Sequence, residues 1–125
     1  MKNLVRLAAF LLLISFTLTG CYYDKESELY RSSAVCDTNI VTYSHSIVPI
    51  MVANCNSCHN TALASGGVIT DTYADLSLVA APGGTLYNGV NWVGDLSPMP
   101  KNLSKLSACD LTKINKWIAA GAPNN

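Results

Sequence analysis

The stretch Cys55-Asn56-Ser57-Cys58-His59 constrains this chain more than any other part of its 125 residues. Two thiols three residues apart lie about one helical turn from each other, and an imidazole follows directly. This spacing lets each sulfur form a thioether with one vinyl group of a haem, while the imidazole bonds the iron. The motif therefore predicts one covalently attached haem c, held by Cys55 and Cys58 and ligated by His59.

Two other chemistries also use a Cys-x-x-Cys pair. A zinc site needs a second pair of ligands at ligand spacing, and His45 is the only other histidine in the sequence. A thioredoxin-like dithiol needs a βαβ context, and the sequence has no convincing strand alternation. The haem interpretation is favoured over both alternatives.

Met99 is the candidate for the second axial ligand of the iron. It lies 40 residues beyond His59, so the chain can wrap the ring and return on its far face. Pro98 and Pro100 restrict the backbone on both sides, which places the thioether on a stiff segment. A thioether stabilises Fe(II), and Met/His ligation raises the reduction potential. The alternatives are a methionine that fills the core and ligation by His45 instead.

The other three cysteines need a separate account. Cys21 follows an apolar N-terminal run and is assigned to the signal region, so Cys36 and Cys109 are the two cysteines that remain. In an exported chain two remaining cysteines predict one disulfide, between Cys36 and Cys109, and two free buried thiols are the alternative. The bond would enclose a loop of roughly 70 residues and stabilise the fold by about 4 kcal/mol in the chain-entropy model.

The first 20 residues have the pattern of a bacterial lipoprotein signal peptide. Lys2 and Arg6 supply positive charge, and the apolar run 7–18 is too short for a comfortable membrane span. The run ends in Leu18-Thr19-Gly20-Cys21, which resembles the lipobox. The resemblance implies cleavage before Cys21 and lipid on that residue, and hence a membrane-anchored protein that faces the periplasm or the cell exterior. An ordinary secretory signal is the alternative.

The sequence lacks the excess of basic residues that is typical of nucleic-acid-binding proteins. The whole chain has eight basic and eight acidic residues. Once Lys2 and Arg6 are removed with the signal peptide, six basic and eight acidic residues remain. We expect residues 1–20 to be the signal peptide, 21–42 a lipid anchor with its polar tether, and 43–125 one folded domain. The expected partners are the membrane and redox proteins that the sequence does not identify.

Helical patterns recur along the expected domain. Apolar spacing predicts a first helix from about Ser44 to Asn56, capped by Ser44 or Ser46, with Pro49 in its first turn or at a kink. Further helices are predicted after the capping box Thr72-x-x-Asp75, from Thr85 to Val90, and after the capping box Ser107-x-x-Asp110. Pro82-Gly83-Gly84 ends the second helix, residues 91–106 form an ordered loop, and Gly121 and Pro123 end the last helix. The predicted fold class is all-α.

Over about residues 43–123 these features resemble a class I c-type cytochrome. Members have a helix leading into Cys-x-x-Cys-His, a Met-Pro step in a mid-chain loop and an aromatic on the last helix, as in Met99-Pro100 and Trp117 here. The resemblance implies a small helical wrap around one haem c, with the first and last helices packed across each other. Trp92 or Tyr87 is either a donor to a haem propionate or a simple packing residue.

The expected function is single-electron transfer by a membrane-tethered monohaem cytochrome, not catalysis. An iron held on both sides by His59 and Met99 has no open site for a substrate. Lys101 and Lys105 either steer an acidic partner or are ordinary solvated lysines. One alternative is a haem protein with a labile sixth ligand that acts as a small-ligand sensor or peroxidase-like enzyme. Another is a non-redox lipoprotein with a fortuitous motif.

Overall fold

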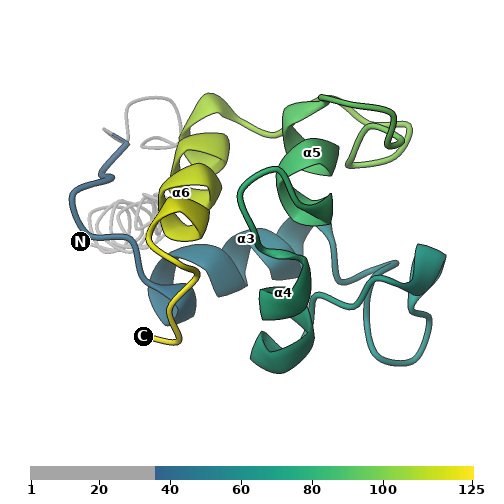
Figure 1. The fold of residues 1–125 in the computed structure, drawn as a ribbon, viewed down its shortest axis with the longest axis horizontal. Coiled ribbons are helices and arrows are strands. Elements are labelled where there is room, and N and C mark those ends of the chain that lie inside the picture. Colours follow the sequence, from purple (N-terminus) through teal and green to yellow (C-terminus); the bar gives the residue numbers. More distant parts are fainter. Residues whose placement is uncertain (1–35) are drawn as a thin grey trace, which may run out of the picture. The chain divides into compact units, whose positions relative to one another are not determined.

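The structure is a computed structural model, and it describes residues 36–125 (Figure 1). The expected signal peptide, the expected lipidation site Cys21 and most of the tether lie outside the described residues. In chain order the elements are η1 (Tyr43–Ile47), α3 (Val48–Asn54), η2 (Ser65–Gly67), α4 (Tyr73–Val79), α5 (Thr85–Asn91) and α6 (Ala108–Ala119). Residues 36–125 contain no strand, so the predicted all-α class is confirmed for this part of the chain.

The first helix is capped by Thr42, whose hydroxyl accepts a hydrogen bond from the amide of His45 at 3.2 Å. The prediction of Ser44 or Ser46 as the cap is wrong, because both residues lie inside the first turn. The amide of Ser44 donates instead to the carbonyl oxygen of Asn125, at 2.9 Å. Asn125 therefore accepts from a backbone amide of the first turn, which has no partner within the helix.

A π-helical segment, η1, opens this helix and continues directly into α3. The amide of Val48 donates to the carbonyl of Tyr43, five residues earlier, which is the wider π spacing. Pro49 follows at once, and its missing N–H would interrupt an ordinary α-helical ladder. Pro49 lies in the first turn of α3, one of the two positions predicted for it.

The next two helices follow their local signals. The hydroxyl of Thr72 accepts from the amide of Asp75 at 3.1 Å and donates to its carboxylate at 2.6 Å, so the predicted capping box starts α4. The sequence Pro82-Gly83-Gly84 separates α4 from α5, as predicted. α5 begins at Thr85 and ends one residue beyond the predicted Val90.

The last helix, α6, starts at the second capping box. Ser107 accepts from the amide of Asp110 at 3.0 Å and donates to its carboxylate at 2.8 Å. Ile114, Trp117 and Ile118 are buried along one side of the helix. α6 contacts both η1 and α5, so the last helix packs against the start of the first one.

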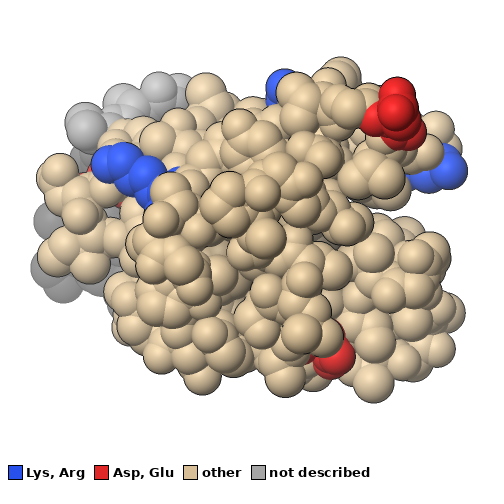
Figure 2. Space-filling model, viewed as in Figure 1, with Lys and Arg blue, Asp and Glu red and all other residues tan. Residues whose placement is uncertain are grey.

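One apolar core holds these helices together. Its buried members are Ile47, Ile50, Met51, Leu76, Ala80, Leu86, Val90, Leu106, Ile114, Trp117, Ile118 and Ala122. Most of the face drawn in Figure 2 carries no charged side chain. Among residues 36–125, no helix has the length and apolar character that a membrane span requires.

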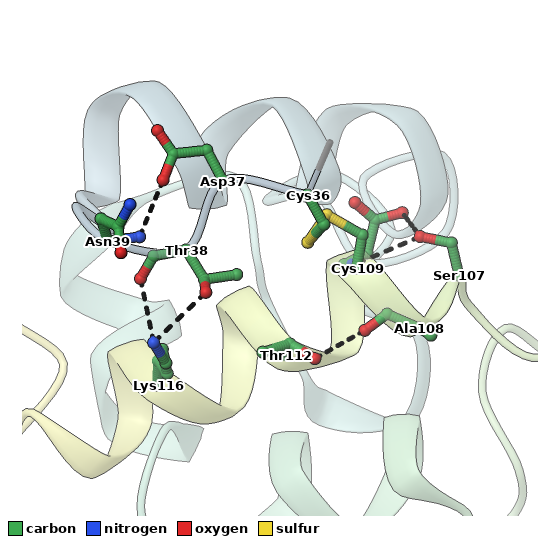
Figure 3. Close-up of a disulfide and its surroundings, with 10 residues drawn as sticks. Cys36, Asp37, Thr38, Asn39, Ser107, Ala108, Cys109, Thr112 and Lys116 are labelled. Carbon is green, nitrogen blue, oxygen red and sulfur yellow. Dashed lines mark hydrogen bonds between the residues drawn. A yellow bond between two sulfur atoms is a disulfide. The ribbon is translucent and has the colours of Figure 1, made fainter. Parts of the chain in front are cut away.

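A disulfide joins the segment before η1 to the first turn of α6 (Figure 3). It links Cys36 to Cys109, with the two Cα atoms 5.6 Å apart. Lys116 donates from Nζ to the carbonyl oxygen of Thr38 at 3.0 Å and to its hydroxyl at 3.2 Å. The compact unit begins at Cys36, so it includes residues 36–42, ahead of the expected domain start at 43.

Candidate functional site

A cavity of about 530 Å³ is lined by two stretches of the chain, the one around the Cys-x-x-Cys-His motif and the one from α5 to Leu106. Its volume lies in the range of small-molecule and cofactor sites. The first wall consists of Asn54, Cys55, Ser57, Cys58, His59, Ser65, Gly66, Val68 and Thr70. The second wall consists of Thr85, Leu86, Gly89, Val90, Leu96, Ser97, Met99, Pro100, Lys101, Leu103 and Leu106.

The structure brings all four residues proposed from the sequence, Cys55, Cys58, His59 and Met99, to this one cavity. The first three directly follow α3. The amides of Cys58 and His59 both donate to the carbonyl oxygen of Cys55, at 3.1 and 2.9 Å, so the chain still turns helically through the motif. This local turn brings the two thiols and the imidazole to the same wall.

The two thiols of the motif have different surroundings. Both are free, and Cys58 is exposed whereas Cys55 is half-buried beside the core. Burial raises the pKa of the Cys55 thiol to about 11, because the thiolate form is poorly solvated there. At neutral pH Cys55 is therefore a protonated thiol.

His59 is oriented by the carbonyl group of Val68. The ring atom Nδ1 lies 3.3 Å from that carbonyl oxygen, which can only accept a hydrogen bond. Nδ1 therefore carries the hydrogen, and the Nε2 atom of the neutral ring keeps its lone pair. This is the hydrogen-bonding arrangement of a metal-ligating histidine.

Thr70 is a site residue that sequence reasoning missed. Its amide donates to the carbonyl oxygen of His59 at 2.7 Å, and its hydroxyl lies 2.8 Å from Oδ1 of Asn56. The side chain is only 4% exposed, the one buried polar residue among the residues described. A lone threonine beyond the motif gives no signal of this role in the sequence.

Met99, in the second stretch of the cavity lining, is held by α5. Its amide donates to the carbonyl oxygen of Gly89 at 3.0 Å, and its carbonyl oxygen accepts from Nε1 of Trp92 at 2.8 Å. The methionine side chain lies close to Gly89, since a Cβ on that glycine would be 3.5 Å from Cγ of Met99. The segment is stiffened by these contacts as well as by the two prolines, and the Met99–Pro100 peptide bond is cis.

The other candidates from the sequence lie in different places. His45 is exposed on η1 and does not line the cavity, and neither does Tyr87. Lys101 lines the cavity wall. Lys105 does not line it, and its Nζ donates to the carbonyl oxygen of Asn91 at 2.6 Å.

Within residues 36–125, no three His, Cys, Asp or Glu side chains gather into a group that could hold a metal ion. Comparisons of the chain with protein-family models, curated proteins and solved structures found no match. The functional conclusion therefore depends on the residues of the cavity and their geometry.

Proposed function

We propose that this chain is a monohaem c-type cytochrome of class I, a small helical wrap around one haem c that carries single electrons. One observation carries the proposal: Cys55, Cys58, His59 and Met99 line a single cavity of about 530 Å³. When bound, haem c supplies an iron that accepts and donates one electron. The chain's own residues attach, ligate and shield it.

The chemistry of the cavity suits a large apolar ring with acidic edges. Its apolar lining includes Val68, Leu86, Val90, Leu96, Leu103 and Leu106. Leu96 and Leu103 are 44% and 69% exposed, and a bound porphyrin would cover such side chains. Lys101 is the one Lys, Arg, Asp or Glu among the described lining residues, and its charge suits the propionate groups of haem.

The two proposed iron ligands come from the two stretches of chain that line the cavity. Because Nδ1 of His59 bonds to the carbonyl of Val68, the lone pair of Nε2 is free to bind a metal. The sulfur of Met99 is a soft ligand, and its backbone is held by a hydrogen bond to Gly89. A haem iron bound by both side chains would have no open position for a substrate. This favours an electron carrier over the sensor or peroxidase-like alternative.

The thiol chemistry argues against a redox-active dithiol. Catalytic Cys-x-x-Cys pairs work through a thiol with a lowered pKa. Burial instead raises the pKa of Cys55 to about 11. A half-buried thiol with a raised pKa lacks the activated thiolate that thiol–disulfide exchange requires.

In this proposal the protein is anchored to a membrane through lipid on Cys21 and faces the periplasm or the cell exterior. The sequence features that support the anchor are the apolar run 7–18 and the lipobox-like end Leu18-Thr19-Gly20-Cys21. Its partners are a redox protein that donates electrons and another that accepts them. Nucleic acid is not among them, because the charge balance offers no basic footprint.

Optical spectra test the function. The chain is produced in cells that attach haem c and is measured oxidised and reduced. We expect a low-spin haem c spectrum with a sulfur-to-iron charge-transfer band in the oxidised form and slow, incomplete binding of carbon monoxide in the reduced form. Protein without haem absorbance would contradict the proposal. Rapid, complete carbon monoxide binding at neutral pH would favour the alternative with a labile sixth ligand.

A further inference from the structure

The backbone of Met99 is tied to the C-terminal end of α5 at two points. Its amide donates to the carbonyl of Gly89, and its carbonyl oxygen accepts from the indole N–H of Trp92, at 3.0 and 2.8 Å. The first bond joins two backbone groups, so side-chain identity does not affect it directly. The second depends on one side chain and is therefore open to replacement.

Trp92 has features that packing alone does not explain. Its indole is 42% exposed, so the side chain is not a core residue. Its backbone is left-handed, with φ at 62°, a conformation that is unfavourable for a residue with a Cβ and a bulky ring. A large aromatic kept exposed in this conformation, with its N–H directed at one carbonyl oxygen, points to a role at that carbonyl.

Contacts from the rest of the fold hold Trp92 in place. Nζ of Lys105 lies 5.6 Å from the centroid of the indole ring and donates to the carbonyl of Asn91. The side chains of Asn91 and Asn115 exchange two hydrogen bonds, at 2.8 and 3.1 Å. These contacts form a continuous series from α6, through the end of α5, to the carbonyl of Met99.

We propose that Trp92 is a positioning residue for the sixth ligand: its indole N–H holds the Met99 segment so that the sulfur stays on the iron. This inference rests on the proposed cytochrome function. Without the indole bond, the segment leaves the iron more often, and the fraction of protein with an open sixth position rises. An external ligand then binds more tightly in proportion to that fraction.

Imidazole titration of the oxidised, haem-loaded protein measures this fraction. In Trp92→Phe, which keeps an aromatic ring and removes the N–H, we expect apparent imidazole affinity to rise about three- to tenfold, as the loss of one net hydrogen bond predicts. The reduction potential should fall, because the thioether that favours Fe(II) is held less firmly. Trp92→Tyr, which also lacks the indole N–H, should show the same changes and serves if the first variant does not fold.

Trp117→Phe is the matched control. It removes an indole bond of similar length, 2.9 Å to the carbonyl oxygen of Pro123. Pro123 does not line the cavity, whereas Met99, the acceptor of the Trp92 bond, does. We expect it to lower the stability of the fold and to leave imidazole affinity unchanged. If haem is attached and Met99 ligates, but both Trp92 variants bind imidazole like the wild type, the inference is overturned and the cytochrome function stands. If the wild type carries no haem, or its iron is not ligated by sulfur, both the inference about Trp92 and the proposed His/Met-ligated cytochrome are contradicted.

Discussion

His59 is clamped by the segment that contains Thr70. The amide of Thr70 donates to the carbonyl oxygen of His59 at 2.7 Å, while the imidazole Nδ1 lies 3.3 Å from the carbonyl oxygen of Val68, two residues before Thr70. Both the backbone and the ring of the proposed ligand are therefore fixed by one short stretch of chain. The Thr70 hydroxyl, in turn, lies 2.8 Å from Oδ1 of Asn56, inside the motif.

This arrangement predicts a stability cost for Thr70→Val. The substitution keeps the side-chain shape but leaves Oδ1 of Asn56 without its partner, so we expect a loss of about 1–3 kcal/mol in the free energy of unfolding, measured by denaturant titration. Thr112→Val is the control, because its hydroxyl bonds only to the carbonyl of Ala108 on the exposed side of α6. That variant should stay within about 0.5 kcal/mol of the wild type. Equal losses in the two variants would contradict the role of Thr70.

Met99→Ala tests the sixth ligand. We expect the haem to stay attached, because Cys55 and Cys58 are untouched, and the sulfur-to-iron charge-transfer band of the oxidised protein to disappear. Met51→Leu is the matched control, because Met51 is buried in the core and 1% exposed, and it should keep the band. A spectrum unchanged by Met99→Ala would remove Met99 as the ligand. The alternative ligand His45 would then be tested by His45→Gln.

The disulfide predicts a large stability difference. Cys36 and Cys109 are 73 residues apart in the sequence, and in the chain-entropy model a loop of that length contributes about 4 kcal/mol. We expect the double variant Cys36→Ser/Cys109→Ser to unfold at a correspondingly lower denaturant concentration, with the optical spectrum of the haem unchanged. Reductant should lower the wild-type midpoint to the same value. A midpoint that neither change moves would contradict the contribution of this bond.

The two motif thiols should differ in reactivity in protein made without haem attachment. Cys58 is exposed, whereas burial raises the pKa of Cys55 to about 11, so iodoacetamide at pH 8 should alkylate Cys58 first. Alkylation of Cys55 should accelerate as the pH approaches 11. In the unfolded chain the thiolate forms near the ordinary value of 9.0, so stability should fall as pH rises from about 9 to about 11. Equal alkylation rates of the two residues at pH 8, read by peptide mapping, would contradict this.

Features encoded within a few residues could be predicted from the sequence. The capping boxes at Thr72 and Ser107 and the break at Pro82 each depend on neighbouring side chains, and the structure has them as predicted. The Cys-x-x-Cys-His motif is equally local. Met99 could be proposed because its two flanking prolines and its distance from the motif are both visible in the sequence.

Features that depend on distant contacts could not be predicted. The first helix begins at Tyr43, and the amide of Tyr43 donates to Oδ1 of Asn125, a residue 82 positions further along the chain. The sequence leaves Trp92 as either a donor to a haem propionate or a packing residue, whereas in the structure its N–H donates to the carbonyl of Met99. Nothing near Trp92 in the sequence identifies a backbone oxygen seven residues away as its acceptor.

The intact mass of the mature protein is the most direct test of covalent haem attachment. For protein made in cells that attach haem c, we predict a mass equal to the polypeptide and its lipid plus one haem, resistant to denaturation. The Cys55→Ser/Cys58→Ser double variant, made in the same cells, should lack the added mass. A wild-type mass accounted for by polypeptide and lipid alone would contradict the account.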